Sequence, residues 1–150
     1  VGTTASVVTT ATTMAAVRIA KAETNHLASA LNATSHILRG DEAARYDRAD
    51  LAHTVAGGAL NASAMGAWAV VNELLPRTRT PLGAIAKGAI VSGLAYVTDY
   101  VIVPKRLTPG FEKRLSPTGM LTIYATLAGA LALGEWLAQR SSFQPIPQRV

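Results

Sequence analysis

The sequence predicts an all-α protein, a membrane-embedded four-helix bundle with an amphipathic interfacial helix in its first loop. Four long stretches carry almost no charge, namely Val1–Val17, Leu51–Asn72, Leu82–Val103 and Leu115–Gly134. Each approaches the roughly 20 helical residues needed to cross a hydrocarbon layer about 30 Å thick. Charged residues make up only 15% of the chain, against roughly 25% in soluble domains. The alternative, a soluble Ala-rich bundle, needs a charged stripe on every helix, and these stretches lack one.

The length of the chain predicts one domain. At 150 residues we expect a single four-span transmembrane domain over residues 1–140. Residues 141–150 contain Pro145 and Pro147, and we expect them to form a flexible C-terminal tail. The chain has no cysteine, which excludes disulfides and thiolate metal sites.

Start and stop signals flank the last three stretches. Carboxylates or hydroxyls that can cap a helix precede each of them, and proline at the first helical position opens two. Proline also follows the second and third stretches, where its missing amide ends a helix. In chain order these signals are Asp47 and Asp50, Pro76, Thr80-Pro81, Pro104, and Ser116-Pro117.

In the first loop, which joins the stretches Val1–Val17 and Leu51–Asn72, we expect a further helix near Asn25–Arg39. Its polar and apolar residues separate onto opposite sides of a helical wheel. The polar side carries Asn25, Ser29, Asn32 and His36, and the apolar side carries Leu27, Leu31 and Leu38. We expect this helix to lie at the membrane surface or to dip into the bundle, with Gly40 as its C-terminal cap.

Small residues recur at helical spacing in the last three spans, as they do where two helix backbones approach closely. They predict the faces on which the helices pack. These faces carry Gly58, Ala62 and Gly66 in the second span, Gly88, Ser92, Ala95 and Asp99 in the third, and Thr122, Thr126 and Gly129 in the fourth.

Asp99, Asn61 and Lys87 are the polar residues within the spans that raise a question of function. Asp99 is the most informative, because a carboxylate at membrane depth is costly and raises a functional hypothesis. It either forms a structural ion pair, with Lys105 and Arg106 near enough to reach it, or a hydrogen bond at the interface, or it handles protons or cations. Asn61 is expected to form a hydrogen bond to a neighbouring helix. The flexible stem of Lys87 allows its ammonium to reach outward.

Histidines raise the question of a metal or haem site. His36 and His53 both lie near the same membrane boundary, and imidazole ligates zinc and haem iron. No HxH, HxxxH or HExxH spacing accompanies them, so we predict no cofactor and keep this pair as a weak alternative. With Asn32, they are instead expected to form hydrogen bonds at the interface.

The loops hold most of the positive charge. Nine of the 14 lysines and arginines lie in or beside the first and third loops, which predicts that these loops are cytoplasmic. The third loop is suited to anionic headgroups or to a partner protein. The residues expected to dock there are Lys105, Arg106, Phe111, Lys113 and Arg114.

Two segments carry a resemblance. They are SHILRGDEAA at residues 35–44 followed by His53-Thr54, and Asp99-Tyr100 leading into VPKRLTPGFE at residues 103–112. They resemble a group of small bacterial inner-membrane proteins of unknown function that look like four-span bundles. The resemblance covers most of residues 30–135 and implies fold and location, with no catalytic role. Many of those proteins have an aromatic residue where this chain has Ile37, and a further histidine near the position of Asn61. Because this chain lacks both, the resemblance does not support a metal site inside its bundle.

We therefore expect a non-enzymatic integral protein of a bacterial inner membrane, acting as an accessory subunit or scaffold. Its expected partners are membrane lipids and other membrane subunits or further copies of itself. Nucleic acid is not expected, because the basic residues lie in loops as membrane topology requires. Two alternatives stay open, a small proton-coupled transporter that uses Asp99, and a haem- or metal-binding redox protein that uses His36 and His53.

Overall fold

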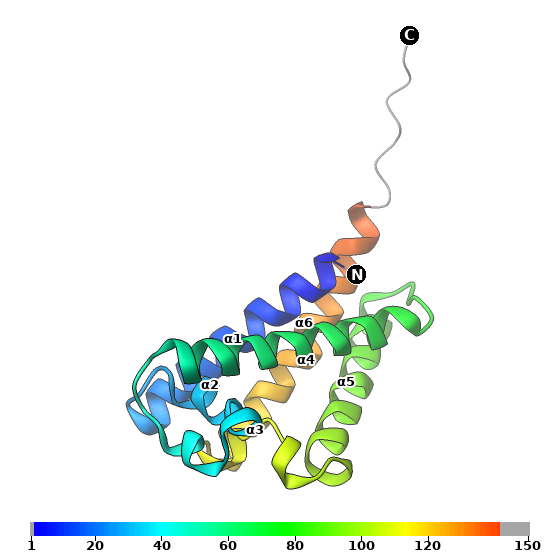
Figure 1. Cartoon of the computed structure of the whole chain (residues 1–150). Helices are drawn as coiled ribbons and strands as arrows, with labels where there is room; N and C mark the ends of the chain where they lie inside the picture. Colours follow the sequence, from blue (N-terminus) through cyan, green and yellow to red (C-terminus); the bar gives the residue numbers. More distant parts are fainter. Residues whose placement is uncertain (1, 142–150) are drawn as a thin grey trace.

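A computed structural model describes residues 2–141 and shows a chain made of helices without strands in that range (Figure 1). Its long helices are α1 (Gly2–Thr24), α4 (Ala56–Leu74), α5 (Pro81–Val97) and α6 (Pro117–Ser141). Apart from Ser141, which ends α6, the predicted C-terminal tail lies outside the described residues.

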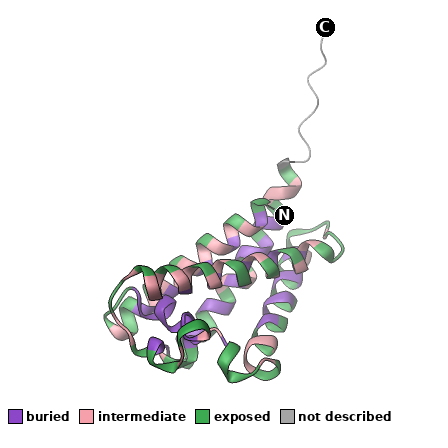
Figure 2. Ribbon diagram, viewed as in Figure 1, coloured by how far each residue is buried: buried purple, intermediate pink, exposed green. Residues whose placement is uncertain are grey.

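The long helices run up and down, and α6 is the central one. Helix α6 packs along both α1 and α5, whereas α4 lies mainly against α1 and touches α5 less (Figure 1). The start of α1, the α4–α5 connection and the end of α6 share one end of the molecule, which we call the terminal end. Inner faces of the helices are buried and outer faces exposed (Figure 2).

The other two connections, from α1 to α4 and from α5 to α6, form the opposite end, which we call the loop end. It gathers the first loop with α2 (Ser29–Thr34), α3 (His36–Arg39) and η1 (Asp41–Arg45), and the third loop with η4 (Lys105–Leu107) and η5 (Phe111–Lys113). Two π-helical segments, η2 (Leu51–Val55) and η3 (Thr98–Ile102), extend α4 and α5 toward this end.

The predicted caps at Asp50, Thr80 and Ser116 are confirmed, whereas Asp47 pairs with Arg114. The backbone N–H of His53 donates to Oδ1 of Asp50 at 2.7 Å, which caps η2. The hydroxyl of Thr80 accepts from Gly83 N at 3.1 Å, and that of Ser116 accepts from Gly119 N at 3.0 Å. Each interaction satisfies an amide that the first turn of a helix leaves without an intrahelical partner.

Within residues 2–141, three helices are long and apolar enough to cross a membrane, namely Leu51–Leu74, Pro81–Ile102 and Pro117–Arg140. Helix α1 is not one of them, although the sequence predicts a span over Val1–Val17. Six threonines between Gly2 and Thr13 lower the hydropathy of α1.

The predicted amphipathic helix at Asn25–Arg39 is wrong in its bounds. Asn25 adopts a positive φ of 62°, and the segment forms two short helices instead of one. Three of its four polar-side residues, Ser29, Asn32 and His36, are buried. Leu31 of the apolar side is buried as well, and the exposed residues are Asn25, His26, Leu27, Leu38 and Arg39. Loop carbonyls supply partners for the polar groups, so of the two expected placements the segment adopts the one inside the bundle.

The packing face of α4 differs from the predicted one by a single residue. A Cβ at Gly57 would lie 1.8 Å from the carbonyl oxygen of Leu31, whereas at Gly58 and Gly66 it would meet open space. The buried face carries Gly57, Asn61, Met65, Ala69 and Asn72. A shift of one residue turns a helix face by about 100°. The stripe of Gly58, Ala62 and Gly66 therefore lies beside the intramolecular contact and outside it.

The predicted stripe of α5 faces α6 directly. A Cβ at Gly88 would lie 2.4 Å from the carbonyl oxygen of Ala128, and Ser92 donates to the carbonyl oxygen of Tyr124 at 2.6 Å. On α6, the predicted seam does not pack within the chain. Thr122 and Thr126 donate to carbonyls of their own helix, and Gly129 faces open space.

Candidate functional site

Ion pairs tie the first loop to the third. Lys113 pairs with Asp41, and Arg114 pairs with Asp47. The Lys113 ammonium, hydrogen-bonded to Asp41, lowers the pKa of that carboxyl below its usual value. The prediction that Lys113 and Arg114 serve docking is corrected here, because acidic residues of the first loop already engage both cations.

Phe111 and His36 hold the third loop onto α2. Phe111 is 3% exposed and belongs to an apolar cluster with α1 and α6, so the prediction of an exposed docking anchor is wrong. His36 is buried as well, with Nε2 2.9 Å from the carbonyl oxygen of Thr108. Between them, Gly110 has φ of +80°, and a Cβ there would lie 2.6 Å from the carbonyl oxygen of Ala33. Only glycine allows the loop to approach α2 this closely.

His53 has partners different from those of His36. Its ring stacks on Tyr46 with centroids 4.2 Å apart, and Nδ1 lies 3.0 Å from Oδ2 of Asp50. The hydrogen bond from the His53 backbone N–H lowers the pKa of the Asp50 carboxyl. Within residues 2–141, no group of three or more histidines and carboxylates is arranged to hold a metal ion. The arrangement thus adds no support to the weak alternative of a metal site on His36 and His53.

Asn32 is a structural residue of the loop end. Its Nδ2 donates to the carbonyl oxygens of Tyr46 and Arg48 at 2.7 and 2.9 Å. Its Oδ1 accepts from the Thr54 hydroxyl at 2.6 Å. These three hydrogen bonds attach α2 to the segment that leads into α4, and they satisfy a fully buried amide.

The loop end contains a cavity of about 580 Å³, which we call the loop-end cavity. Lys105, Arg106, Glu112 and Lys113 supply charge to its lining, together with Asp41. The side chains of Lys105 and Arg106 are exposed and form no ion pair within residues 2–141. This places two of the predicted docking residues on one cavity, free to meet a ligand.

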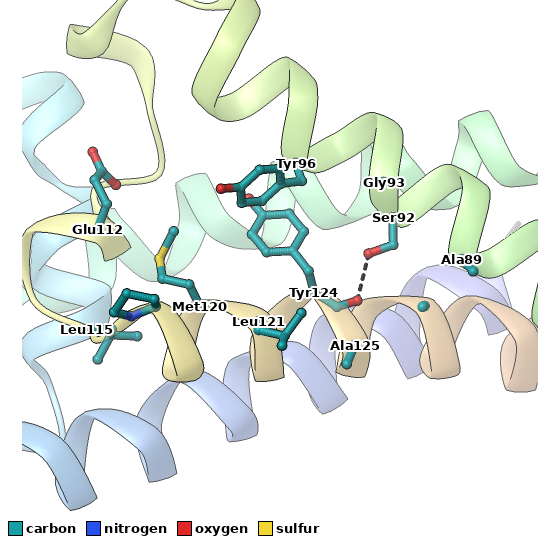
Figure 3. Close-up of a pocket in the computed structure, with 12 residues that line it drawn as sticks. Ala89, Ser92, Gly93, Tyr96, Glu112, Leu115, Met120, Leu121, Tyr124 and Ala125 are labelled. Carbon is teal, nitrogen blue, oxygen red and sulfur yellow. Dashed lines mark hydrogen bonds between the residues drawn. The ribbon is translucent and has the colours of Figure 1, made fainter.

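An apolar groove of about 620 Å³ runs between α5 and α6, and we call it the α5–α6 groove (Figure 3). Small residues leave it hollow, and larger apolar and aromatic side chains line the rest. The small residues are Ala89, Ser92, Gly93, Ala125 and Ala128, and the larger ones include Tyr96, Met120, Leu121 and Tyr124. Glu112 and Leu115 line its loop-end portion.

Asp99 and Asn61 line a third, smaller cavity of about 100 Å³ inside the bundle. The Tyr124 hydroxyl donates to Oδ2 of Asp99 at 2.7 Å. The amide of Asn61 donates to the Thr13 hydroxyl of α1 at 3.3 Å, which is a contact between helices. Asp99 forms no ion pair with Lys105 or Arg106, because the extended backbone at positions 103 and 104 leads the basic pair into η4.

The sequence reasoning missed a buried ion pair at the terminal end. Lys87 Nζ lies 3.0 Å from Oε2 of Glu135, and their side chains are only 8% and 5% exposed. Glu135 Oε1 accepts hydrogen bonds from the backbone N–H and hydroxyl of Thr78 at 2.9 and 3.1 Å. Lys87 therefore points inward, not outward as expected. The two residues lie on different helices and far apart in sequence, so no spacing rule reveals the pair.

Comparisons with known proteins add no family to this description. No family model, no curated protein and no solved structure matches the chain. The resemblance to small inner-membrane proteins therefore stays a prediction. The function is argued below from the geometry of the chain itself.

Proposed function

We propose that this chain is an integral membrane protein that acts as a non-catalytic scaffold and docks a second copy of itself through α4. Membrane embedding is supported by the apolar side chains that α4 and α5 expose. On the two helices and their extensions these include Leu51, Val55, Val70, Leu74, Leu82, Ile85, Ile90, Leu94, Val97, Val101 and Ile102. A soluble monomer rarely exposes so much contiguous apolar surface, whereas lipid solvates it.

The proposed location is a bacterial inner membrane with the loop end in the cytoplasm. Both basic loops gather at the loop end, which agrees with the tendency of lysine and arginine to remain on the cytoplasmic side. On this orientation the terminal end lies on the opposite side of the membrane.

The observation that carries the scaffold proposal is the open space beside α4. A Cβ at Gly58 or Gly66 meets no atom within 4 Å, so the stripe of Gly58, Ala62 and Gly66 is free for another helix. In lipid, such stripes drive association because close backbone approach increases van der Waals contact. We propose that a second copy presents the same stripe, as two-fold symmetry requires.

A disulfide experiment tests this proposal, since the natural chain has no cysteine. Ala62→Cys should give a disulfide-linked dimer in native membranes under mild oxidation. Adding Gly58→Leu and Gly66→Leu should reduce the cross-linked fraction at least about fivefold, because leucine blocks the close approach. Gly93→Leu is the matched control, since its Cβ also meets open space on a different helix, and it should leave cross-linking unchanged.

Three results would contradict the proposal. Release of the chain from membranes by alkaline carbonate would reject membrane embedding. A wild-type chain that stays monomeric in mild detergent, with no cross-link at Ala62→Cys, would reject self-association. If one different membrane polypeptide copurifies and is lost in the double leucine variant, the α4 face belongs to a larger complex instead.

A second candidate function is a small proton-coupled carrier, favoured by the cavity that Asp99 and Asn61 share. Asp99→Asn in reconstituted vesicles should then reduce proton flux at least about tenfold, because an amide cannot take up and release a proton. Asp41→Asn, which changes a carboxylate outside that cavity, is the control and should retain flux. A wild-type chain without measurable flux, measured with a pH-sensitive dye inside the vesicles, excludes this candidate.

A further inference from the structure

We propose that the loop-end cavity and the α5–α6 groove together bind one phospholipid that carries a single net negative charge. Its phosphate would lie at Lys105 and Arg106, and one acyl chain would lie in the groove. The inference rests on the membrane embedding proposed above, and it does not depend on self-association through α4.

Glu112 lines both hollows. Charged side chains line part of the loop-end cavity, whereas the groove is lined mostly by alanine, glycine, leucine and aromatic residues (Figure 3). An amphiphile that enters one hollow with its headgroup can therefore place its apolar chain in the other.

The position of the groove suits an acyl chain. It opens between α5 and α6, two of the three helices that are long and apolar enough to span a membrane. Gly93 faces open space, and small side chains recur along both walls, so the hollow follows the helices. In a bilayer such a hollow must be filled by something apolar, because a void forfeits van der Waals contacts.

The charges of the loop-end cavity match an anion of charge −1. Lys105, Arg106 and Lys113 contribute three positive charges, and Asp41 and Glu112 contribute two negative ones, so these five side chains sum to +1. Lys113 and Asp41 engage each other. Lys105 and Arg106 therefore remain for a phosphate, a group that lysine and arginine commonly bind.

The Glu112 carboxylate favours headgroups that carry hydroxyls and disfavours headgroups of higher negative charge. Its Oε1 accepts a hydrogen bond from the Thr108 hydroxyl at 2.7 Å, which leaves acceptor capacity on the carboxylate. A headgroup that bears hydroxyls as well as one phosphate, as phosphatidylglycerol does, can donate to this carboxylate. A headgroup of higher negative charge would meet repulsion from Glu112 once the two free cations are neutralised.

The experiment measures lipid binding to the detergent-purified full chain by native mass spectrometry. Phosphatidylglycerol and phosphatidylethanolamine with identical acyl chains are the probes. We expect one phosphatidylglycerol to bind, with at least about tenfold higher affinity than phosphatidylethanolamine, since two basic residues face the phosphate. Lys105→Gln with Arg106→Gln should remove most of this preference.

Matched controls separate the site from general surface charge. Arg77→Gln with Arg79→Gln removes the same charge from exposed residues at the terminal end, and it should change the affinity less than about twofold. Gly93→Leu should weaken phosphatidylglycerol binding by filling the groove, whereas Gly66→Leu, which also enters open space, should not.

Different results would overturn the headgroup site and the acyl-chain site. Equal binding of the two lipids, or equal effects of the two double glutamine variants, would reject the headgroup site. Unchanged binding in Gly93→Leu, or equally tight binding of glycerol 3-phosphate alone, would reject the acyl-chain site. Failure of self-association would appear separately, in the Ala62→Cys cross-link, which Gly93→Leu leaves unchanged.

Discussion

Gly57→Ala is expected to destabilise the protein by about 3 kcal/mol, the upper part of the range for overpacking a close contact. The new Cβ would lie 1.8 Å from the carbonyl oxygen of Leu31 and 2.8 Å from its carbonyl carbon. Both atoms belong to the backbone of α2, so no side-chain rotation can relieve the clash. Helix α2 must then move away from α4, which strains the hydrogen bonds that Asn32 makes to the loop.

The neighbouring residue provides the control. Gly58→Ala adds a Cβ into open space, and alanine favours a helix over glycine by roughly 1 kcal/mol. We therefore expect Gly58→Ala to be neutral or stabilising. Thermal or denaturant unfolding in detergent, followed by circular dichroism, measures both variants. Equal stability of the two would show that α2 does not contact α4 at Gly57.

Lys87→Met is expected to cost about 3–5 kcal/mol, because it leaves the buried carboxylate of Glu135 without its cation. The cost arises from desolvation, since both side chains are less than a tenth exposed. Lys87 Nζ also lies 3.3 Å from the carbonyl oxygen of Pro76, so the α4–α5 connection should loosen as well. Hydrogen exchange of residues 75–80 should accelerate together with the loss of stability.

The double variant Lys87→Met with Glu135→Leu tests whether the unpaired Glu135 carboxylate causes the loss of stability. Apolar replacement of both partners removes the unpaired charge, so the double variant should be more stable than Lys87→Met alone. The coupling energy comes from a double-mutant cycle of unfolding free energies. Arg79→Met, which alters an exposed cation of the same connection, should change stability by less than about 0.5 kcal/mol. A similarly small effect of Lys87→Met would mean that the ammonium reaches solvent.

The helical segments follow from local features of the sequence. Asp50, Thr80 and Ser116 each cap the helix that they were expected to start, because capping depends on residues three positions apart. Gly88 and Ser92 lie on the face of α5 that packs, since a small residue is needed wherever two backbones meet. Long apolar segments identify α4, α5 and α6 as helices able to cross a membrane.

The candidate site was only partly visible in the sequence. Lys105 and Arg106 were selected for their charge, and they do line a cavity. Lys113 and Arg114 share that charge, and Phe111 is an aromatic that could anchor a ligand, yet all three pack or pair within the chain. Composition identifies a group that can bind a ligand, but it does not show whether another part of the chain already engages that group.

Taken alone, the sequence determined the three long apolar helices, the caps at Asp50, Thr80 and Ser116, and the absence of any cysteine chemistry, all of which depend on residue type and short spacing. Only the tertiary structure decided that the packing face of α4 starts at Gly57, that α2 is buried along its whole length, and that Lys87 meets Glu135. Periodicity shows which side chains share a helix face. Which face becomes buried depends on the partner placed against it, because lipid and protein interior are both apolar surroundings.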